Sequence, residues 1–214
     1  MPANRETASR PAAILIHGLW MTGLEMGLLG RRLGRAGFST HRFPYSSRRA
    51  TPQANIAALA DFINRLPQPR IHLVGHSLGG ASALLLAARA DPPPGPGGDP
   101  EPSLCRQPAR PATDELRSSR PVAGKSRPTD RTVIDPGAVP ATGVIAGDRG
   151  YGLGWWLPTL PRPHDGTVAL AETMIHGTTD RVIVPQGHLA MLFNRRVAEL
   201  VIAFLRRGSF TTGN

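Results

Sequence analysis

Short apolar runs alternate with helical patterns through the first ninety residues of the chain. Strand candidates occupy 12–16 (AAILI), 38–43 (FSTHRF) and 70–75 (RIHLVG). Apolar residues recur at helical spacing over 24–36, 51–66 and 78–90. Gly37 follows the first helical stretch where a helix stop is expected, and Thr51 with Pro52 opens the second. Strands alternating with helices predict an α/β fold, a mostly parallel sheet with helices on both faces.

The same alternation returns in the last third of the chain. Strand candidates occupy 143–147 (GVIAG) and 181–184 (RVIV), and a helical pattern follows over 189–206. The length of 214 residues suits one α/β domain with a sizeable core. We therefore expect residues 1–214 to form a single domain.

The segment 91–131 differs from both of these parts. It holds 10 Pro and 4 Gly in 41 residues, no aromatic residue, and few large aliphatic ones. Such a stretch buries too little apolar surface to offset the entropy of ordering it. We expect it to be disordered or loosely draped over the domain.

Charge and cysteine content exclude several classes of protein. The net charge is +10, but the 24 Arg and the single Lys are scattered, without the basic patch or reading motif of a nucleic-acid-binding protein. Cys105 is the one cysteine, so neither an internal disulfide nor a cysteine-based zinc site is available. No apolar run approaches the roughly 20 residues that cross a bilayer, and the N-terminus lacks the order of a secretory signal. We expect a soluble, cytoplasmic protein that binds no nucleic acid.

The clearest chemical signal is the G-x-S-x-G motif at 75–79. Ser77 lies between a predicted strand and a predicted helix, flanked by His76 and Leu78, with Gly75 and Gly79 two residues away. In this context the sharp turn exposes the serine hydroxyl, and the glycines let neighbouring backbone pass close by. The amide groups that begin the helix would face a developing oxyanion. The motif predicts a nucleophilic serine.

A second element follows the first predicted strand. The sequence His17-Gly18-Leu19-Trp20 stands where this architecture draws another oxyanion donor. The N–H groups of Leu19 and Leu78 would then bind the same carbonyl oxygen. We expect His17 to be a structural histidine that ties loops together.

A serine nucleophile needs a histidine to take its proton, and in this fold that histidine comes last in the chain. Three histidines follow the serine motif: His164, His176 and His188. His188 lies just after the predicted strand 181–184, which is the position of the base. His176 precedes that strand and is expected at the opposite edge of the sheet. His164 adjoins an acidic candidate and is expected to be a neighbour of that residue rather than the base.

Three aspartates compete for the acid that orients the histidine. Asp148 directly follows the predicted strand 143–147, Asp165 stands in the turn sequence HDGTV, and Asp180 precedes the last strand. Asp180 would lie at the wrong end of the sheet. Spacing alone leaves Asp148 and Asp165 equally supported.

Four segments together resemble the small bacterial α/β-hydrolases related to minimal, lid-less lipases and esterases: ILIHGLW, VGHSLGG, HDGTVALAET and the closing GHLAMLF…VAELVIAFLRRGSF. The resemblance covers about residues 11–90 and 141–210. It implies Asp165 as the acid, His188 as the base, and Leu19 and Leu78 as oxyanion residues. It also implies ester hydrolysis without a cofactor or a metal.

The chain departs from that family after the third predicted helix. Relatives have a valine-rich strand and a Gly-Ser-Pro turn there, and this chain has the segment 91–131 instead. We hypothesise that this segment is translated in a shifted reading frame, bounded by two compensating frame changes in GC-rich DNA. The alternative is a genuine insertion acting as a lid or linker, with 132–135 (TVID) supplying the strand.

Adjacent tryptophans occur in the stretch 151–157 (YGLGWWL). Trp155 and Trp156 are candidates for the wall of an acyl pocket or for an apolar rim that touches lipid, and core packing is the alternative. Together with Trp20 they are our candidates for contacts to substrate.

These observations predict a serine hydrolase in which Ser77, Asp165 and His188 cleave a small-molecule ester or a lipid. His17, Gly18, Gly75, His76 and Gly79 are expected to support the site. The alternatives are an inactive or misfolded protein of the hydrolase fold, and an acyltransferase. The sequence indicates neither the acyl chain length nor the oligomeric state.

Overall fold

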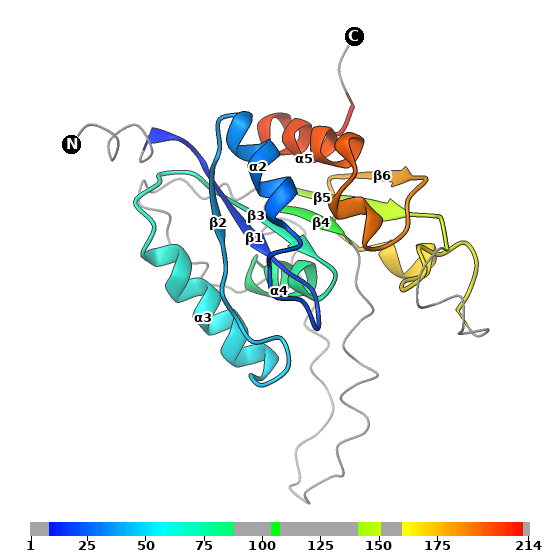
Figure 1. The fold of residues 1–214 in the computed structure, drawn as a ribbon, viewed down its shortest axis with the longest axis horizontal. Coiled ribbons are helices and arrows are strands. Elements are labelled where there is room, and N and C mark those ends of the chain that lie inside the picture. Colours follow the sequence, from blue (N-terminus) through cyan, green and yellow to red (C-terminus); the bar gives the residue numbers. More distant parts are fainter. Residues whose placement is uncertain (1–8, 88–103, 108–140, 151–159, 212–214) are drawn as a thin grey trace, which may run out of the picture.

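A computed structural model describes residues 9–87, 104–107, 141–150 and 160–211, and in 104–107 it describes the backbone. Within this part of the chain, six parallel strands form one sheet in the order β2-β1-β3-β4-β5-β6 (Figure 1). The strands are β1 (Ala12–Ile16), β2 (Ser39–Arg42), β3 (Ile71–His76), β4 (Leu104–Gln107), β5 (Thr142–Gly147) and β6 (Asp180–Val184). The predicted parallel sheet is confirmed.

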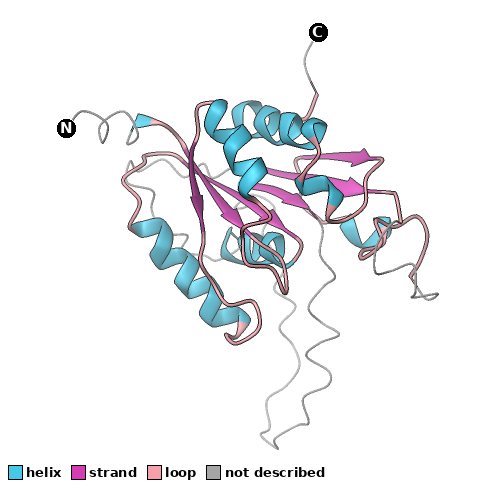
Figure 2. Ribbon diagram, viewed as in Figure 1, coloured by secondary structure: helices cyan, strands magenta, loops and turns pink. Residues whose placement is uncertain are grey.

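Two pairs of helices cover the two faces of this sheet (Figure 2). They are α2 (Gly27–Arg35) with α5 (Arg195–Arg207), and α3 (Pro52–Asn64) with α4 (Leu78–Ala87). Successive strand side chains point to opposite faces, so Ala13 and Leu15 of β1 join a core cluster with α2 and α5. Ile14 and Ile16 pack with α3 and α4 on the other face. None of the helices that the structure describes is long and apolar enough to cross a membrane.

Local capping explains where the helices begin and end. Thr51 Oγ1 accepts a hydrogen bond from Ala54 N at 3.2 Å and starts α3 as predicted. The predicted helix 189–206 is wrong at its start, because Asn194 adopts an extended conformation and its Oδ1 accepts a hydrogen bond from Val197 N at 3.2 Å. The cap divides the segment into a short 3₁₀ turn, η4 (Ala190–Leu192), and α5.

The segment 91–131 contributes one strand to the sheet. Residues Leu104–Gln107 form β4, which pairs with β3 and with β5. Both neighbours lie inside the sheet and their backbone groups need partners, which β4 provides. The expectation that 91–131 has no regular structure is therefore wrong for these four residues. The rest of that segment and 132–135, the alternative source of this strand, lie outside the described residues.

Candidate active site

Ser77 occupies a strained turn between β3 and α4. Its φ of 54° lies in the left-handed region that side chains other than glycine rarely adopt. The glycines on either side are required by close approaches. A Cβ on Gly75 would lie 2.5 Å from Gly80 Cα, and a Cβ on Gly79 would lie 2.5 Å from the His17 carbonyl oxygen. The structure thus has the backbone geometry expected of a nucleophile elbow.

The loop after β1 lies directly against this elbow. A Cβ on Gly18 would lie 3.1 Å from Ser77 Cβ and 3.2 Å from His76 Nδ1. Leu19 follows Gly18, and Leu78 is the first residue of α4. In the described part of the chain, neither the Leu19 N–H nor the Leu78 N–H donates a hydrogen bond to another residue. Both candidate oxyanion donors are therefore available to a ligand.

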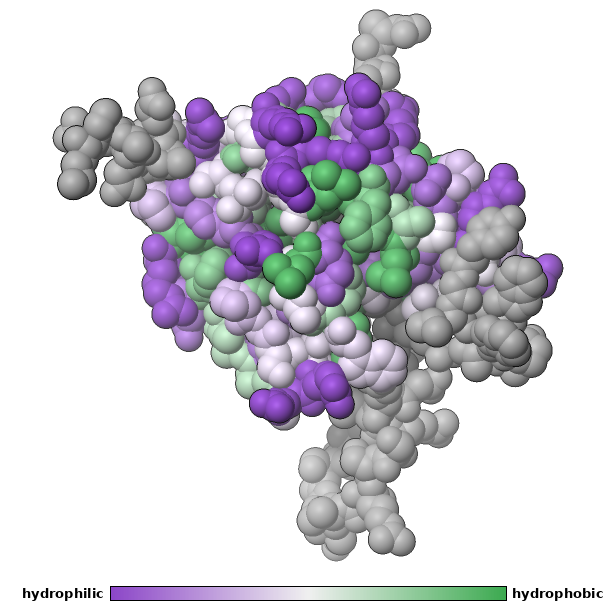
Figure 3. All heavy atoms as spheres, in the orientation of Figure 1, coloured by the Kyte–Doolittle hydropathy of each residue, from purple (hydrophilic) through white to green (hydrophobic). Residues whose placement is uncertain are grey.

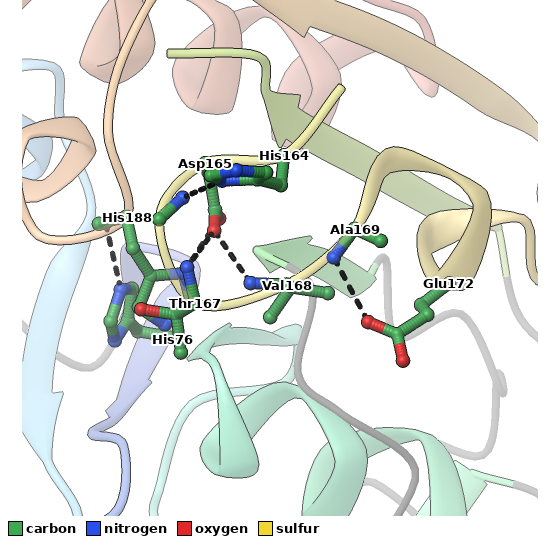
Figure 4. Close-up of polar contacts among 9 residues, drawn as sticks. His76, His164, Asp165, Thr167, Val168, Ala169, Glu172 and His188 are labelled. Atoms are coloured by element: carbon green, nitrogen blue, oxygen red, sulfur yellow. Dashed lines mark hydrogen bonds and ion pairs between the residues drawn. The ribbon is translucent and has the colours of Figure 1, made fainter. Parts of the chain in front are cut away.

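A buried pair, His188 and Asp165, connects two loops beyond the ends of β5 and β6. His188 Nδ1 lies 2.7 Å from Asp165 Oδ2. The other carboxylate oxygen, Oδ1, accepts hydrogen bonds from Thr167 N at 2.9 Å and Val168 N at 2.8 Å (Figure 4). These backbone bonds fix the carboxylate, so Oδ2 is directed at the imidazole. The backbone adds a further link, because His188 N donates to Asp165 O at 2.9 Å.

Gly147, the last residue of β5, makes room for this pair. A Cβ at this position would collide with the Gln186 carbonyl oxygen and would lie 2.9 Å from Asp165 Cβ. The glycine therefore lets the two loops that carry Asp165 and His188 approach the end of the sheet.

His76 connects His188 to the elbow. Its Nε2 donates to the His188 carbonyl oxygen at 3.2 Å, and the two rings have centroids 4.6 Å apart (Figure 4). Burial, and after it the nearby His188, lowers the pKa of His76 to about 3. His76 therefore stays neutral near pH 7 and places no positive charge beside His188. The contact brings His188 against the residue that precedes Ser77.

The competing candidates lie elsewhere or have other partners. Asp148 is partly exposed and pairs with Arg149 at 3.9 Å, without a hydrogen bond to His188. Asp180 Oδ2 accepts hydrogen bonds from Ser209 Oγ at 2.8 Å and Phe210 N at 2.6 Å, which anchors the segment after α5. His176 is exposed on the loop that enters β6. His164 Nδ1 accepts a hydrogen bond from Gly166 N at 3.0 Å and shapes the turn that holds Asp165.

His17 joins two loops around the site. The buried ring stacks on Tyr45 with centroids 4.3 Å apart, and the Tyr45 hydroxyl donates to the His17 carbonyl oxygen at 2.6 Å. Burial raises the pKa of Tyr45, so this hydroxyl keeps the proton that it donates. Tyr45 was not predicted from the sequence, although an aromatic residue just beyond a strand end was an available signal.

A hollow of about 530 Å³ lies beside the β1–α2 loop. Its walls are residues of that loop and of the β2–α3 loop: Trp20, Met21, Thr22, Tyr45, Ser46, Ser47, Arg48 and Arg49. Trp20, one of the predicted substrate contacts, is 72% exposed there. The other two, Trp155 and Trp156, lie outside the described residues.

Exposed apolar side chains also occur beside α2 and η4. They are Leu24 ahead of α2, and Leu189 and Phe193 on either side of η4. Figure 3 shows hydrophobic surface over these elements. Residues 9–87, 141–150 and 160–211 contain no group of three His, Cys, Asp or Glu side chains that could hold a metal ion.

The fold is similar to that of several solved structures. The product of gene lin2722 from Listeria innocua is 18% identical, with a TM-score of 0.61 over 96% of this chain and 97% of that one. Est1E from Butyrivibrio proteoclasticus is 17% identical, with a TM-score of 0.60 over 94% and 89%. The Pyrococcus furiosus esterase Pf2001 is 14% identical, with a TM-score of 0.62 over 94% and 84%.

No match was found among curated proteins. The family model described as "Alpha/beta hydrolase family" matches residues 13–209, which include the elbow and both members of the His188–Asp165 pair. The chain therefore belongs to the alpha/beta hydrolase family.

Proposed function

We propose that this protein is a serine hydrolase that cleaves carboxylic esters, with Ser77 as nucleophile, His188 as base and Asp165 as the acid that orients it. The observation that carries the proposal is the buried His188–Asp165 hydrogen bond of 2.7 Å, which lies against His76, the residue before a serine with φ of 54°. The Pyrococcus furiosus esterase Pf2001, whose fold is similar to that of this chain, adds support for esters as substrates.

Each group has a defined task in the first half of the reaction. Ser77 Oγ attacks the ester carbonyl carbon while His188 Nε2 takes the hydroxyl proton. Asp165 accepts a hydrogen bond from His188 Nδ1–H and stabilises the imidazolium. The Leu19 and Leu78 N–H groups bind the oxyanion. When the tetrahedral intermediate collapses, His188 gives the proton to the departing alcohol and Ser77 is left acylated.

Water completes the second half by the same route. His188 takes a proton from water, the resulting hydroxide attacks the acyl carbon, and the proton returns to Ser77 Oγ as the acid leaves. Small-molecule esters and lipids are both candidate substrates, because Leu189, which follows His188, and also Leu24 and Phe193 are exposed apolar side chains. Contact with a lipid surface would use the same side chains.

A fluorophosphonate probe and p-nitrophenyl butyrate test this proposal together. We expect the purified chain to be labelled and to hydrolyse the ester, and Ser77→Ala to lose labelling and about 10⁶-fold in kcat. Ser39→Ala, at the opposite edge of the sheet, is the matched control and should keep both properties. Labelling that survives in Ser77→Ala would remove Ser77 as the nucleophile. An added alcohol that outcompetes water as acceptor would make the protein an acyltransferase.

A further inference from the structure

The hollow beside the β1–α2 loop is lined by basic residues, and hydrogen bonds fix the two loops that form its walls. Trp20 N donates to Ser47 Oγ at 3.2 Å, and Arg49 N donates to Ser46 Oγ at 3.2 Å, so hydrogen bonds hold its walls together. Arg48 and Arg49 are exposed, and their guanidinium groups have no ion-pair partner in the described part of the chain. Two arginines without an ion-pair partner in the described residues thus line the hollow of about 530 Å³.

This hollow adjoins the nucleophile. A single point, the position of a Cβ on Gly18, lies 3.0 Å from Met21 Sδ and 3.1 Å from Ser77 Cβ. Met21 lines the hollow. Met21 Sδ and Ser77 Cβ are therefore no more than about 6 Å apart. A substrate that extends from Ser77 past Met21 therefore meets the hollow at this wall.

The charges around the hollow favour a single negative charge. Glu25 accepts hydrogen bonds from Thr22 N at 3.3 Å and Thr22 Oγ1 at 3.4 Å, and Thr22 lines the hollow. Among the residues that line the hollow and their hydrogen-bond partners, Arg48 and Arg49 are positive and Glu25 is negative, which leaves a net charge of about one positive unit. A carboxylate matches that charge and the planar fork of a guanidinium group. The exposed ring of Trp20 offers apolar surface for the segment between the carboxylate and the ester.

We propose that the hollow beside the β1–α2 loop binds a carboxylate group of the substrate. The enzyme then prefers esters that carry a carboxylate on their acyl or alcohol part. The inference rests on the proposed ester hydrolysis. The hollow then determines specificity, while Ser77, His188 and Asp165 carry out the chemistry.

Two pairs of matched esters test this preference. Mono-p-nitrophenyl glutarate is compared with its terminal amide, and 4-butyryloxybenzoate with 4-butyryloxybenzamide, so each pair differs by one charge. We expect kcat/KM to favour the anionic member of at least one pair by about tenfold, since an arginine–carboxylate contact is charge-assisted but here partly solvated. Raising the salt concentration should reduce that ratio.

Two double variants separate the hollow from the general positive charge of the protein. Arg48→Gln/Arg49→Gln should abolish the preference. Arg35→Gln/Arg207→Gln removes the same charge from exposed residues at the ends of α2 and α5. These residues lie toward the end of the strands opposite the hollow, so this variant should keep the preference for anionic esters. Equal ratios in the two variants would overturn the proposal, as would wild-type ratios near one for both ester pairs. Circular dichroism establishes that each variant is folded.

A binding measurement keeps the inference separate from the proposed function. Glutarate is titrated into the wild-type chain and into both double variants, and calorimetry measures its binding. This measurement requires no turnover. Binding that is lost only in Arg48→Gln/Arg49→Gln supports carboxylate binding in the hollow, whether or not an ester is cleaved. Binding without cleavage of any ester would count against the proposed ester hydrolysis and not against the hollow. Cleavage of the neutral esters without a charge preference and without glutarate binding would overturn the inference and leave the hydrolase standing.

Discussion

Gly79 lies closer to neighbouring backbone, the end of β1, than the other glycines of the site. The substitution Gly79→Ala tests this close packing most directly. The new Cβ would lie 2.5 Å from the His17 carbonyl oxygen and nearer still to that of Ile16. Ordinary van der Waals contact begins at about 3.4 Å, so the overlap is about 1 Å. Both obstructing atoms belong to the backbone, so no side-chain rotation relieves the clash, and β1 and the start of α4 must separate.

The cost follows from that separation. Overpacking of this kind costs about 1–3 kcal/mol, and a backbone clash belongs at the upper end of that range. For a chain of this length, about 3 kcal/mol lowers the unfolding midpoint by about 6–12 °C. The same displacement moves Leu78 N–H relative to the loop that carries Leu19. A misplacement of about 1 Å is expected to lower kcat by about 100-fold.

Gly34→Ala is the matched control, because a Cβ on this α2 glycine has nothing within 4 Å. The control should be more stable than the wild type by about 0.5–1 kcal/mol, the ordinary gain from replacing a helical glycine. Thermal unfolding followed by circular dichroism gives both midpoints, and p-nitrophenyl butyrate hydrolysis gives kcat. A Gly79→Ala variant with the wild-type midpoint would refute the tight packing of β1 against α4.

Asp165→Asn should lower kcat for p-nitrophenyl butyrate by about 10⁴-fold, because His188 loses the carboxylate that orients it. Asp148→Asn should change kcat less than twofold. The reverse ranking would make Asp148 the acid. Burial, and after it Arg70, lowers the pKa of His72 from 6.5 to about 4, so the stability that depends on neutral His72 is complete above pH 6.5 and is lost as pH falls toward 4. At pH 5 this loss is about 2 kcal/mol. In urea unfolding, the free energy of unfolding of His72→Leu should therefore fall by about 2 kcal/mol less than that of the wild type between pH 7 and pH 5. An equal fall in both proteins would contradict the pKa shift. Resequencing the gene should reveal a pair of compensating single-base changes around 91–131 that restores a valine-rich strand; without such a pair the frame-shift hypothesis fails.

Local patterns predicted most of the fold, because they are written in neighbouring residues. The strands β1, β3, β5 and β6 and the N-terminus of α3 at Thr51 follow from apolar runs and a capping residue. The predictions were wrong where a distant or competing contact decided the structure. Asn194 interrupts a helical pattern that apolar spacing alone continues, and β4 forms within an unfavourable composition because β3 and β5 both present edges to be paired.

By itself the sequence determined the parallel architecture and the elbow at Ser77, since strand, turn and helix signals coincide within a few residues. Spacing alone left Asp148 and Asp165 equal, because both follow the same strand, and only the family resemblance favoured Asp165. Only the tertiary structure brings Asp165 into contact with His188, which lies 23 residues later in the chain, because Gly147 admits the two loops that carry them. The same holds for the hollow between Trp20 and Arg49, whose walls come from two loops that meet only once β1 and β2 lie side by side.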